Sequence, residues 1–120
     1  MDRFKVLNDT FGHAVGDEVL KYSARIIEKR LRRTDKLYRL GGEEFAIILN
    51  HGGVKSALLA AQDLKSFIAM NKPKDLPHFT ISFGVAQLKH SENVETWLTR
   101  ADKALYASKD KGRDQITTAH

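Results

Sequence analysis

Two adjacent carboxylates follow a pair of glycines in the stretch Gly41-Gly42-Glu43-Glu44-Phe45. Glycines lack side chains and let a ligand reach the backbone, while carboxylate oxygens suit a hard cation such as Mg²⁺. Because neighbouring side chains of a strand point to opposite faces, we expect Glu43 and Glu44 to have different tasks unless the turn disturbs the alternation. The alternative, which so short a string favours on its own, is a solvated hairpin turn.

A second polar stretch, residues 8–17, places an amide, carboxylates and two glycines just before a helical pattern. An amide and a carboxylate together present donors and acceptors that match the edge of a purine base. This stretch is therefore a candidate purine site. The alternative is a loop with Asn8 in a turn and Asp17 as the helix cap. His13 has no second ligand at metal-binding spacing, and we interpret it as structural.

Cations bracket a glycine in a third stretch, Lys109-Asp110-Lys111-Gly112-Arg113. Arginine gives bidentate contacts to phosphate and lysine acts as a point charge, so this stretch could clamp a triphosphate. Cations at the end of a helix also stabilise the helix dipole, and that simpler interpretation stays open.

Apolar residues recur at helical spacing in segments that we predict as helices over residues 17–33, 54–70 and 94–109. Gly112 is predicted to end the last of them. Both prolines fall within residues 71–78, which we predict to be a loop. One face of each helix is expected to hold Val19, Leu20, Ser23, Ile26, Ile27, Arg30 and Leu31; Val54, Ala57, Leu58, Ala61, Leu64 and Ile68; and Trp97, Leu98, Ala101, Ala104 and Leu105.

Strand-forming residues occupy residues 36–40 and 44–49, and Gly41 and Gly42 between them predict a tight hairpin. Residues 78–88 alternate between large apolar and small side chains, which predicts a strand that a helix approaches closely on its small-residue face. A short last strand is predicted around residues 114–117.

The predicted elements follow the order helix, hairpin, helix, strand, helix. With one strand added before the first helix, this order becomes βαββαβ, the ferredoxin-like plan of an α+β protein. We therefore expect a sheet that contains antiparallel strands and is covered by helices, in one domain over residues 1–120.

The chain has 120 residues, a formal net charge of +5 and no cysteine. The charge favours anionic partners, and the missing cysteines exclude disulfides and thiolate metal sites. No apolar run is long enough for a membrane span and no signal peptide is visible, so we expect a cytoplasmic location. RNA-binding domains share the ferredoxin-like plan, but their exposed sheet aromatics are lacking here, and we expect no nucleic-acid partner.

Five strings, in this order, resemble the GGDEF family of diguanylate cyclases over essentially the whole chain. They are Phe4-Lys5-Val6-Leu7-Asn8-Asp9, Gly12-His13-Ala14-Val15-Gly16-Asp17, Gly41-Gly42-Glu43-Glu44-Phe45, Ser82-Phe83-Gly84-Val85-Ala86, and Ala101-Asp102-Lys103-Ala104-Leu105-Tyr106 leading into Lys109-Asp110-Lys111-Gly112-Arg113. The resemblance implies a nucleotide-cyclase-like fold and the condensation of two GTP into cyclic di-GMP. It also implies Mg²⁺ or Mn²⁺, a homodimer that completes the reaction, and a sensor or receiver domain upstream.

The resemblance also implies a role for each matching position. Asn8 and Asp17 would bind guanine. The phosphates would be bound by Lys5, Lys109, Arg113 and the backbone of Phe4, next to Gly41 and Gly42 of the substrate site. Glu43 and Glu44 would serve the metal and the attacking 3′-hydroxyl, and the backbone of Met1 would complete the metal site.

A further pair, Arg32 and Asp35, stands shortly before the glycine pair, and in this family such a pair looks like an inhibitory site for cyclic di-GMP. The simpler interpretation is a basic helix end followed by a polar turn. The next helix offers only Lys55 and Lys65 as additional cations. A receptor that binds cyclic di-GMP without catalysis is the alternative function.

The family pattern Asp-x-Asp-x-Phe-Lys is matched only from its second position, with Met1 and Asp2 in the middle and second Asp positions. The first Asp, a metal ligand in the family, has no counterpart, so the domain is expected to be incomplete at its N-terminus and weak or inactive in catalysis. We expect residues 1–7 to form a remnant strand, or the chain to dimerise or swap an element.

Overall fold

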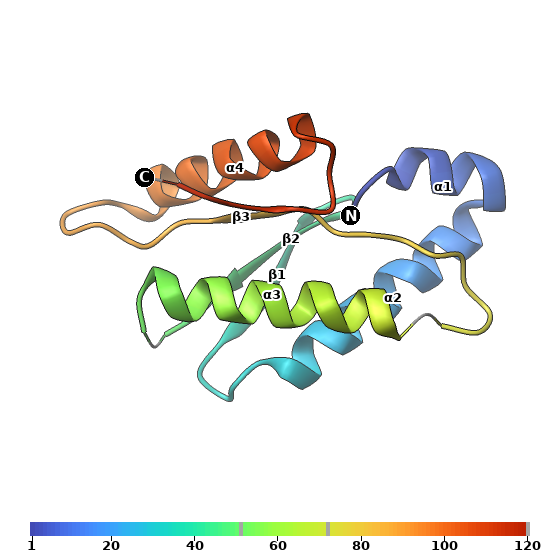
Figure 1. Ribbon diagram of the computed structural model, residues 1–120, viewed down its shortest axis with the longest axis horizontal. Coiled ribbons are helices and arrows are strands. Elements are labelled where there is room, and N and C mark those ends of the chain that lie inside the picture. The colour runs from blue at the N-terminus through green and yellow to red at the C-terminus, as the bar shows by residue number, and fades with distance from the viewer. Residues whose placement is uncertain (51, 72, 120) are drawn as a thin grey trace.

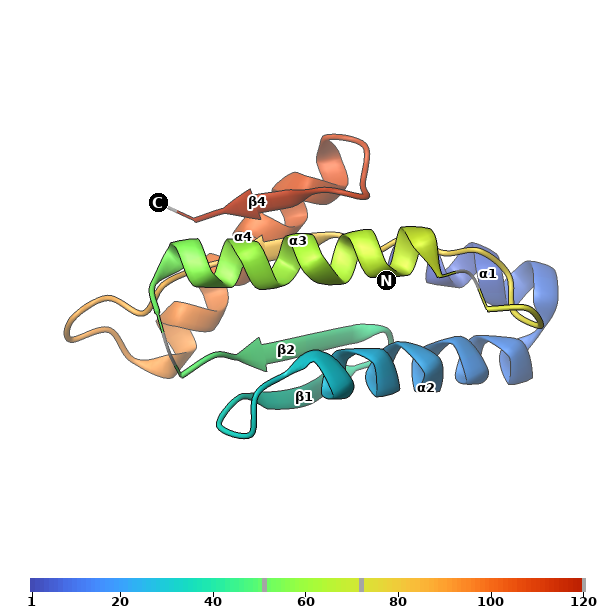
Figure 2. The ribbon, with the colours of Figure 1, turned by 60° about the horizontal axis from the view of Figure 1, so that its bottom comes forward.

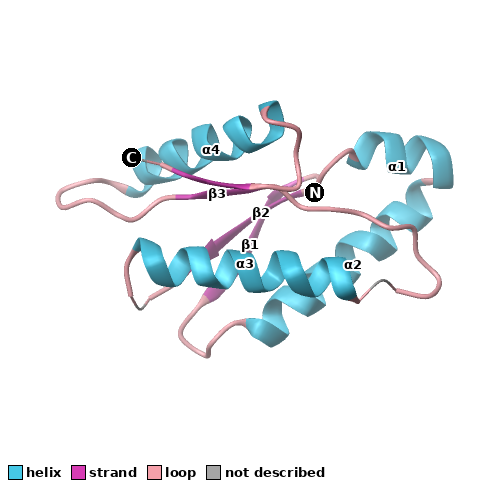
Figure 3. Cartoon of the chain, viewed as in Figure 1, coloured by secondary structure: helices cyan, strands magenta, loops and turns pink. Residues whose placement is uncertain are grey.

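The computed structural model describes residues 1–50, 52–71 and 73–119. None of the helices in that part of the chain is long and apolar enough to cross a membrane. Figure 1 shows the arrangement, and Figure 3 shows how short the strands are beside the helices. In chain order the elements are α1 (Phe4–Phe11), α2 (His13–Arg30), β1 (Lys36–Gly41), β2 (Glu44–Ile48), α3 (Val54–Met70), β3 (Phe83–Val85), α4 (Val94–Asp110) and β4 (Ile116–Thr118).

The core lies mainly between α2 and α3 and is extended by the start of the chain. One cluster of buried residues joins Met1, Leu7, Val19, Leu20, Ile68 and Phe79. A second joins Ile26, Ile27 and Leu64, with partly buried residues from β1, β2 and β3 packed against it. The helical spacing of the apolar residues on α2 and α3 therefore places them as predicted.

A charged side chain also ties α2 to α3. Arg30 donates from Nε and Nη2 to the carboxylate of Asp63 at 2.6 and 2.8 Å. Its guanidinium also lies 4.2 Å from the ring centroid of Phe67. One arginine thus combines a bidentate ion pair with a cation–π contact at the edge of the core.

The strands form two separate two-stranded sheets in the part of the chain that the structure describes. The strands β1 and β2 pair antiparallel, with a register irregularity between Arg39 and Gly41. The strands β3 and β4 pair parallel, with Phe83 opposite Ile116. Figure 1 shows β3 and β4 between α4 and α3, and Figure 2 shows the β1–β2 hairpin beside α2.

The close approach of a helix to the small-residue face of β3 is confirmed at Gly84. A Cβ atom there would lie 2.1 Å from the Ala101 carbonyl oxygen and 2.3 Å from the Leu105 amide nitrogen. These are backbone atoms of α4, so the helix sits directly on the strand and leaves no space for a side chain.

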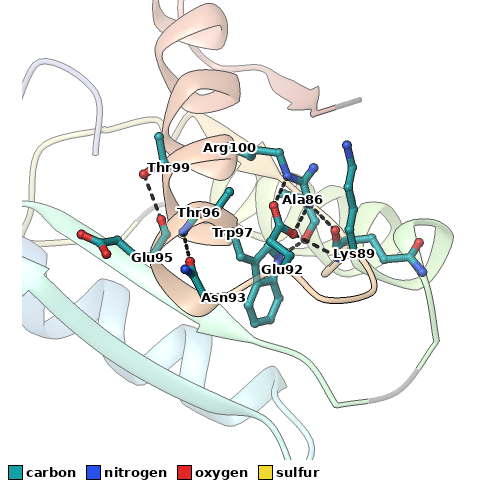
Figure 4. Close-up of polar contacts among 10 residues, drawn as sticks. Ala86, Lys89, Glu92, Asn93, Glu95, Thr96, Trp97, Thr99 and Arg100 are labelled. Carbon is teal, nitrogen blue, oxygen red and sulfur yellow. Dashed lines mark hydrogen bonds and ion pairs between the residues drawn. The ribbon is translucent and has the colours of Figure 1, made fainter.

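A network of polar contacts fixes the N-terminal end of α4 to the loop after β3 (Figure 4). The carboxylate of Glu92 accepts from Nε and Nη2 of Arg100 at 2.6 and 2.8 Å, and from the Lys89 amide at 3.0 Å. Asn93 caps the helix by accepting from the Thr96 amide at 2.7 Å. The indole of Trp97 donates to the Ala86 carbonyl at 2.8 Å, which attaches the first turn of α4 to the backbone after β3.

The predicted helices agree with the structure except at the first one. The prediction for α3 is confirmed, and α4 ends one residue later than expected. The first helix was predicted over residues 17–33, but α2 runs from His13 to Arg30, because the chain breaks at Gly12 with a φ of 94° and Leu31 is extended. Asp17 therefore does not cap it. The prediction that Leu98 faces inward is also wrong, since its exposed fraction is 41%.

Residues 4–11 form a helix, so the predictions of a loop around Asn8 and of a remnant strand over residues 1–7 are wrong. The strand predicted over residues 78–88 is limited to β3, because β4 offers backbone partners to those three residues alone. The last strand starts at Ile116, two residues later than predicted, since Arg113 and Asp114 have left-handed backbones.

Candidate functional site

The hairpin between β1 and β2 carries both predicted carboxylates at its tip. Gly41 and Gly42 have positive φ angles of 147° and 49°, which explains why glycines stand there. Glu43 lies in the turn, Glu44 opens β2, and both are half-buried. Arg39 donates from Nε and Nη2 to the Gly42 carbonyl at 3.0 and 2.7 Å and braces the tip. The sequence analysis did not identify Arg39, although it stands only three residues before Gly42.

The start of the chain lies against this tip. The amino group of Met1 donates to the Glu43 carbonyl at 3.1 Å. Burial lowers the pKa of this amino group, as does Lys109, while Asp2 and the carboxylates of Glu43 and Glu44 act in the opposite direction. Both tip carboxylates and Lys109 therefore lie within electrostatic range of the Met1 amino group.

Asp2 is a buried carboxylate that the sequence analysis did not assign to the site. Its oxygens accept from the hydroxyls of Thr80 and Ser82 at 2.7 and 2.6 Å and from the Asp114 amide at 3.0 Å. Burial alone would raise the pKa of Asp2, but these hydrogen bonds outweigh it and hold the pKa below its usual value. Asp2 is thus ionised and fully engaged with protein donors.

Asn8 lies on α1 with its amide pressed against α2. A Cβ at position 16 would lie 1.8 Å from Asn8 Oδ1 and 3.2 Å from Cζ of Phe4, so Gly16 makes room for both side chains. The Oδ1 atom of Asn8 is buried and has no hydrogen-bond partner among the residues that the structure describes. A buried amide oxygen without a partner is costly, and a ligand donor would satisfy it.

An open groove of about 410 Å³ runs between α2 and the β1–β2 hairpin. Its charged wall residues are Asp17, Lys21 and Glu28 from α2 and Arg39 from β1, and the others are apolar. The volume is within the range of small-molecule sites. The groove is lined by Asp17, Leu20, Lys21, Ala24, Glu28, Leu37, Arg39 and Phe45.

Three predicted phosphate-binding cations have no hydrogen bond or ion pair from their side chains within the described residues. Lys5 is exposed on α1, Lys109 is half-buried in the last turn of α4, and Arg113 is half-buried in the following turn. Phe4, whose backbone was predicted to bind phosphate, packs its ring against the core. The structure thus places Lys109 near the hairpin tip and leaves Lys5 on the surface of α1.

Arg32 and Asp35 lie at the other end of the hairpin, away from the glycine tip. The Asp35 carboxylate accepts from the backbone amides of Arg32 and Asn50 at 2.9 and 3.3 Å. The side chain of Arg32 is exposed. Both oxygens of Asp35 therefore support the turn that leads into β1, while the guanidinium of Arg32 faces solvent.

Oxygen donors suited to Mg²⁺ lie at the hairpin tip. Within the described residues, no group of three or more His, Asp or Glu side chains is arranged to hold a metal ion. Mg²⁺ is usually bound by one or two carboxylates together with substrate phosphates and water, so a complete protein cage is not required. Glu43, Glu44 and the backbone carbonyl of Met1 fit that donor set.

The sequence matches the family described as "Diguanylate cyclase, GGDEF domain" over residues 1–115. It is 40% identical over 118 residues to diguanylate cyclase DgcM of Escherichia coli (strain K12), covering 98% of this chain and 29% of that protein. It is 39% identical over 122 residues to diguanylate cyclase A of Treponema denticola, covering 98% of this chain and 33% of that protein. The chain thus spans about a third of the length of the curated relatives that it matches.

Solved structures agree with these relatives. The active GGEEF domain of a diguanylate cyclase from Vibrio cholerae superposes with a TM-score of 0.91 at 32% identity, covering 99% of this chain and 78% of that one. The GGDEF domain of DgcB from Caulobacter crescentus, in complex with c-di-GMP, superposes with a TM-score of 0.90 at 34% identity, covering 98% and 72%. The predicted α+β, nucleotide-cyclase-like fold is confirmed.

Proposed function

This chain belongs to the GGDEF family of diguanylate cyclase domains, and from that premise we propose that it binds GTP and condenses two GTP molecules into cyclic di-GMP. The observation that carries the proposal is the buried Oδ1 atom of Asn8 beside Gly16 of α2, for which no described residue supplies a hydrogen-bond donor. Asp17, the next residue of that helix, lines the groove between α2 and the β1–β2 hairpin.

The proposed base site distinguishes guanine from adenine by its hydrogen bonds. The carboxylate of Asp17 accepts hydrogen bonds only, and guanine offers it the N1–H and N2–H donors of one edge. Adenine lacks that pair of donors and would leave the carboxylate unpaired. The amide of Asn8 offers a donor and an acceptor to a second edge of the base. A site built from such polar groups rejects an analogue that cannot pair with them.

The proposed phosphate site lies at the hairpin tip and at the end of α4. Lys109 and Arg113 would bind triphosphate oxygens. Lys5 and the backbone of Phe4 would contribute from α1. The backbone of Gly41 and Gly42, which have no side chains, would contribute from the hairpin tip. Glu43, Glu44 and the Met1 carbonyl would hold Mg²⁺ or Mn²⁺. Such an ion, when bound, neutralises charge on the phosphate oxygens.

The proposed reaction is an in-line displacement at phosphorus. The 3′-oxygen of one GTP forms a bond to the α-phosphorus of a second, the bond from that phosphorus to the bridging oxygen breaks, and pyrophosphate leaves. A tip carboxylate accepts the proton of the 3′-hydroxyl. The 3′-oxygen of the second GTP attacks the α-phosphorus of the first in the same way, a second pyrophosphate leaves, and the ring closes. Each chain holds one nucleotide, so two chains must meet face to face, and positioning supplies most of the catalysis.

Arg32 and Asp35 are proposed as a product-binding site that limits the activity. The exposed guanidinium of Arg32 suits phosphate or guanine. Support also comes from the DgcB domain of Caulobacter crescentus, whose structure is a complex with c-di-GMP. Binding at Asp35 would require its carboxylate to exchange the backbone amides of the turn for donors of the ligand.

Control by another protein or domain is also proposed, together with a cytoplasmic location where GTP is available. The diguanylate cyclase SiaD from Pseudomonas aeruginosa, which covers 98% of this chain at 33% identity with a TM-score of 0.88, was solved in complex with its activator SiaC. A sensor or receiver domain is the kind of regulator that we expect for this chain.

Titration calorimetry with GTP and with ATP, each with Mg²⁺, tests the base site, and chromatography of the incubated mixture tests for cyclic di-GMP. We expect GTP to bind more tightly than ATP, and Asp17→Asn to reduce the preference by about tenfold or more. Asp9→Asn, an exposed carboxylate on α1, is the matched control and should leave the preference unchanged. Equal binding of both nucleotides, or no binding of GTP at millimolar concentration, would overturn the proposal.

A further inference from the structure

The carboxylate of Asp2 connects three segments that are distant in sequence. It is 6% exposed and lies just before α1. Thr80 and Ser82, from the segment that leads into β3, donate their hydroxyls to it at 2.7 and 2.6 Å. The amide of Asp114, in the turn between α4 and β4, donates at 3.0 Å. The Asp2 side chain therefore connects the turn to the segment before β3 and to the start of the chain.

That turn has an unusual backbone. Gly112, Arg113 and Asp114 have successive positive φ angles of 112°, 66° and 50°. Side-chain-bearing residues rarely adopt this region, and surrounding contacts must hold them there. The Arg113 amide bonds the Ser108 carbonyl at 3.0 Å, and the Asp114 amide bonds Asp2. Asp2 thus supplies the contact that holds the second of the two left-handed non-glycine residues.

A second anchor of the turn is weaker. Nζ of Lys65 on α3 lies 3.6 Å from the Asp114 carboxylate, and the two side chains are 35% and 52% exposed. An ion pair of that length between exposed groups contributes little. The partly buried hydrogen bond from the Asp114 amide to Asp2 is the better-defined contact, and it acts on the backbone next to Arg113.

We propose that Asp2 is a positioning residue that fixes the left-handed turn of Arg113 and so sets the affinity of the site for the triphosphate, without touching the nucleotide. This inference rests on the proposed function, in which Lys109 and Arg113 bind phosphate. A cation held in its bound geometry loses less conformational freedom when the ligand arrives, and that difference appears as affinity.

The test compares Asp2→Ala with Ser82→Ala by titration calorimetry using GTP and GMP, each with Mg²⁺. Ser82 contacts the other oxygen of Asp2, away from the turn, and is the matched control. We expect Asp2→Ala to weaken GTP binding by about tenfold, the scale of one hydrogen bond to a charged group, and to leave GMP binding nearly unchanged. Ser82→Ala should lower the melting temperature and leave the affinity for both nucleotides unchanged.

A double variant separates a positioning role of Asp2 from a merely structural one. If Asp2 acts through Arg113, substitution of Asp2 should have no further effect on GTP affinity in an Arg113→Ala background. Equal losses for GTP and GMP, or a full loss that persists in that background, would overturn the inference. Failure of the unmodified chain to bind GTP would overturn the proposed function instead.

Asp2→Asn serves as the second variant if Asp2→Ala does not fold. Its amide can keep an acceptor toward the Asp114 amide while donating to Ser82. We expect slow hydrogen exchange of the Asp114 amide and near-normal GTP affinity to occur together in this variant. Normal affinity combined with fast exchange would contradict the inference, as would weak binding combined with slow exchange.

Discussion

The two ends of α4 hold their charged residues under opposite conditions. At the N-terminal end, Glu92 and Arg100 neutralise each other at 2.6 Å, and the Glu92 side chain is only 6% exposed. At the C-terminal end, the side chains of Lys109 and Arg113 have no hydrogen bond or ion pair with any described residue. The same helix thus carries a self-contained polar network at one end and uncompensated cations at the other. The difference separates groups that stabilise the fold from groups that are available to an anion.

The largest expected effect is a loss of GTP affinity when the cations at the C-terminal end of α4 are removed. Replacing Lys109 and Arg113 together by alanine should weaken GTP binding by about a hundredfold, because two charge-assisted hydrogen bonds are lost. The free energy of unfolding should change by no more than about 0.5 kcal/mol, as for other surface substitutions. Titration calorimetry and urea denaturation measure the two quantities.

Arg100→Ala is the control for this pair. It should lower the midpoint of urea unfolding and leave GTP affinity within twofold, as expected for a cation outside the site. A variant of Lys109 and Arg113 that unfolds more easily but still binds GTP normally would show that these cations serve the fold.

A smaller effect is expected on the free energy of unfolding when acid protonates Glu92 at the N-terminal end of α4. The guanidinium of Arg100, with the Lys89 amide, lowers the pKa of Glu92 from 4.5 to about 2. The folded pKa lies below the unfolded one, so this contribution is complete above pH 4.5 and is lost as the pH falls toward 2. Asp2, whose pKa is also lowered, acts in the same direction.

Urea midpoints measured between pH 7 and pH 2.5 check this expectation. Glu92→Gln should be less stable than the unmodified chain at pH 7 and should lose less stability on acidification. Parallel curves for the two proteins would show that the ion pair does not contribute to the acid sensitivity.

The smallest effect is expected at the helix cap. Asn93→Ala should destabilise the chain by about 1 kcal/mol, because the Thr96 amide loses its acceptor. Asn93→Asp keeps an acceptor and should restore most of the loss. Thermal unfolding of the three proteins gives the comparison, and an alanine variant as stable as the aspartate variant would contradict the role of the cap.

Sequence patterns predicted those elements whose signals are local. The helix α3 and the hairpin were predicted because periodic apolar residues and a glycine pair identify them without reference to the rest of the chain. The helix α1 was missed, since the polar and glycine residues near position 8 suggested a loop. The length of β3 was overestimated because a strand ends where its partner ends, and β4 lies about 30 residues further along the chain.

The candidate site was inferred from residue types that by themselves suggest chemistry, and its assignment stays a prediction. The tip carboxylates and the cations after α4 stand in compact strings, and the structure brings Lys109 into the neighbourhood of the tip. Asp2 was not assigned to the site because its partners Thr80, Ser82 and Asp114 are 78 to 112 residues away. No pattern within a short window identifies a contact of that kind, since folding alone brings the groups together.

Gly16 has a consequence for reading genetic variants of this domain. A methyl group at position 16 would lie 1.8 Å from Oδ1 of Asn8 and 3.2 Å from Cζ of Phe4, and both atoms are at the far ends of side chains that can move. We therefore expect an alanine allele to yield a folded, abundant protein in which the Asn8 amide has moved away from the proposed base site. Screens that report expression or solubility would score such an allele as neutral, whereas a screen for discrimination between nucleotides would score it as defective.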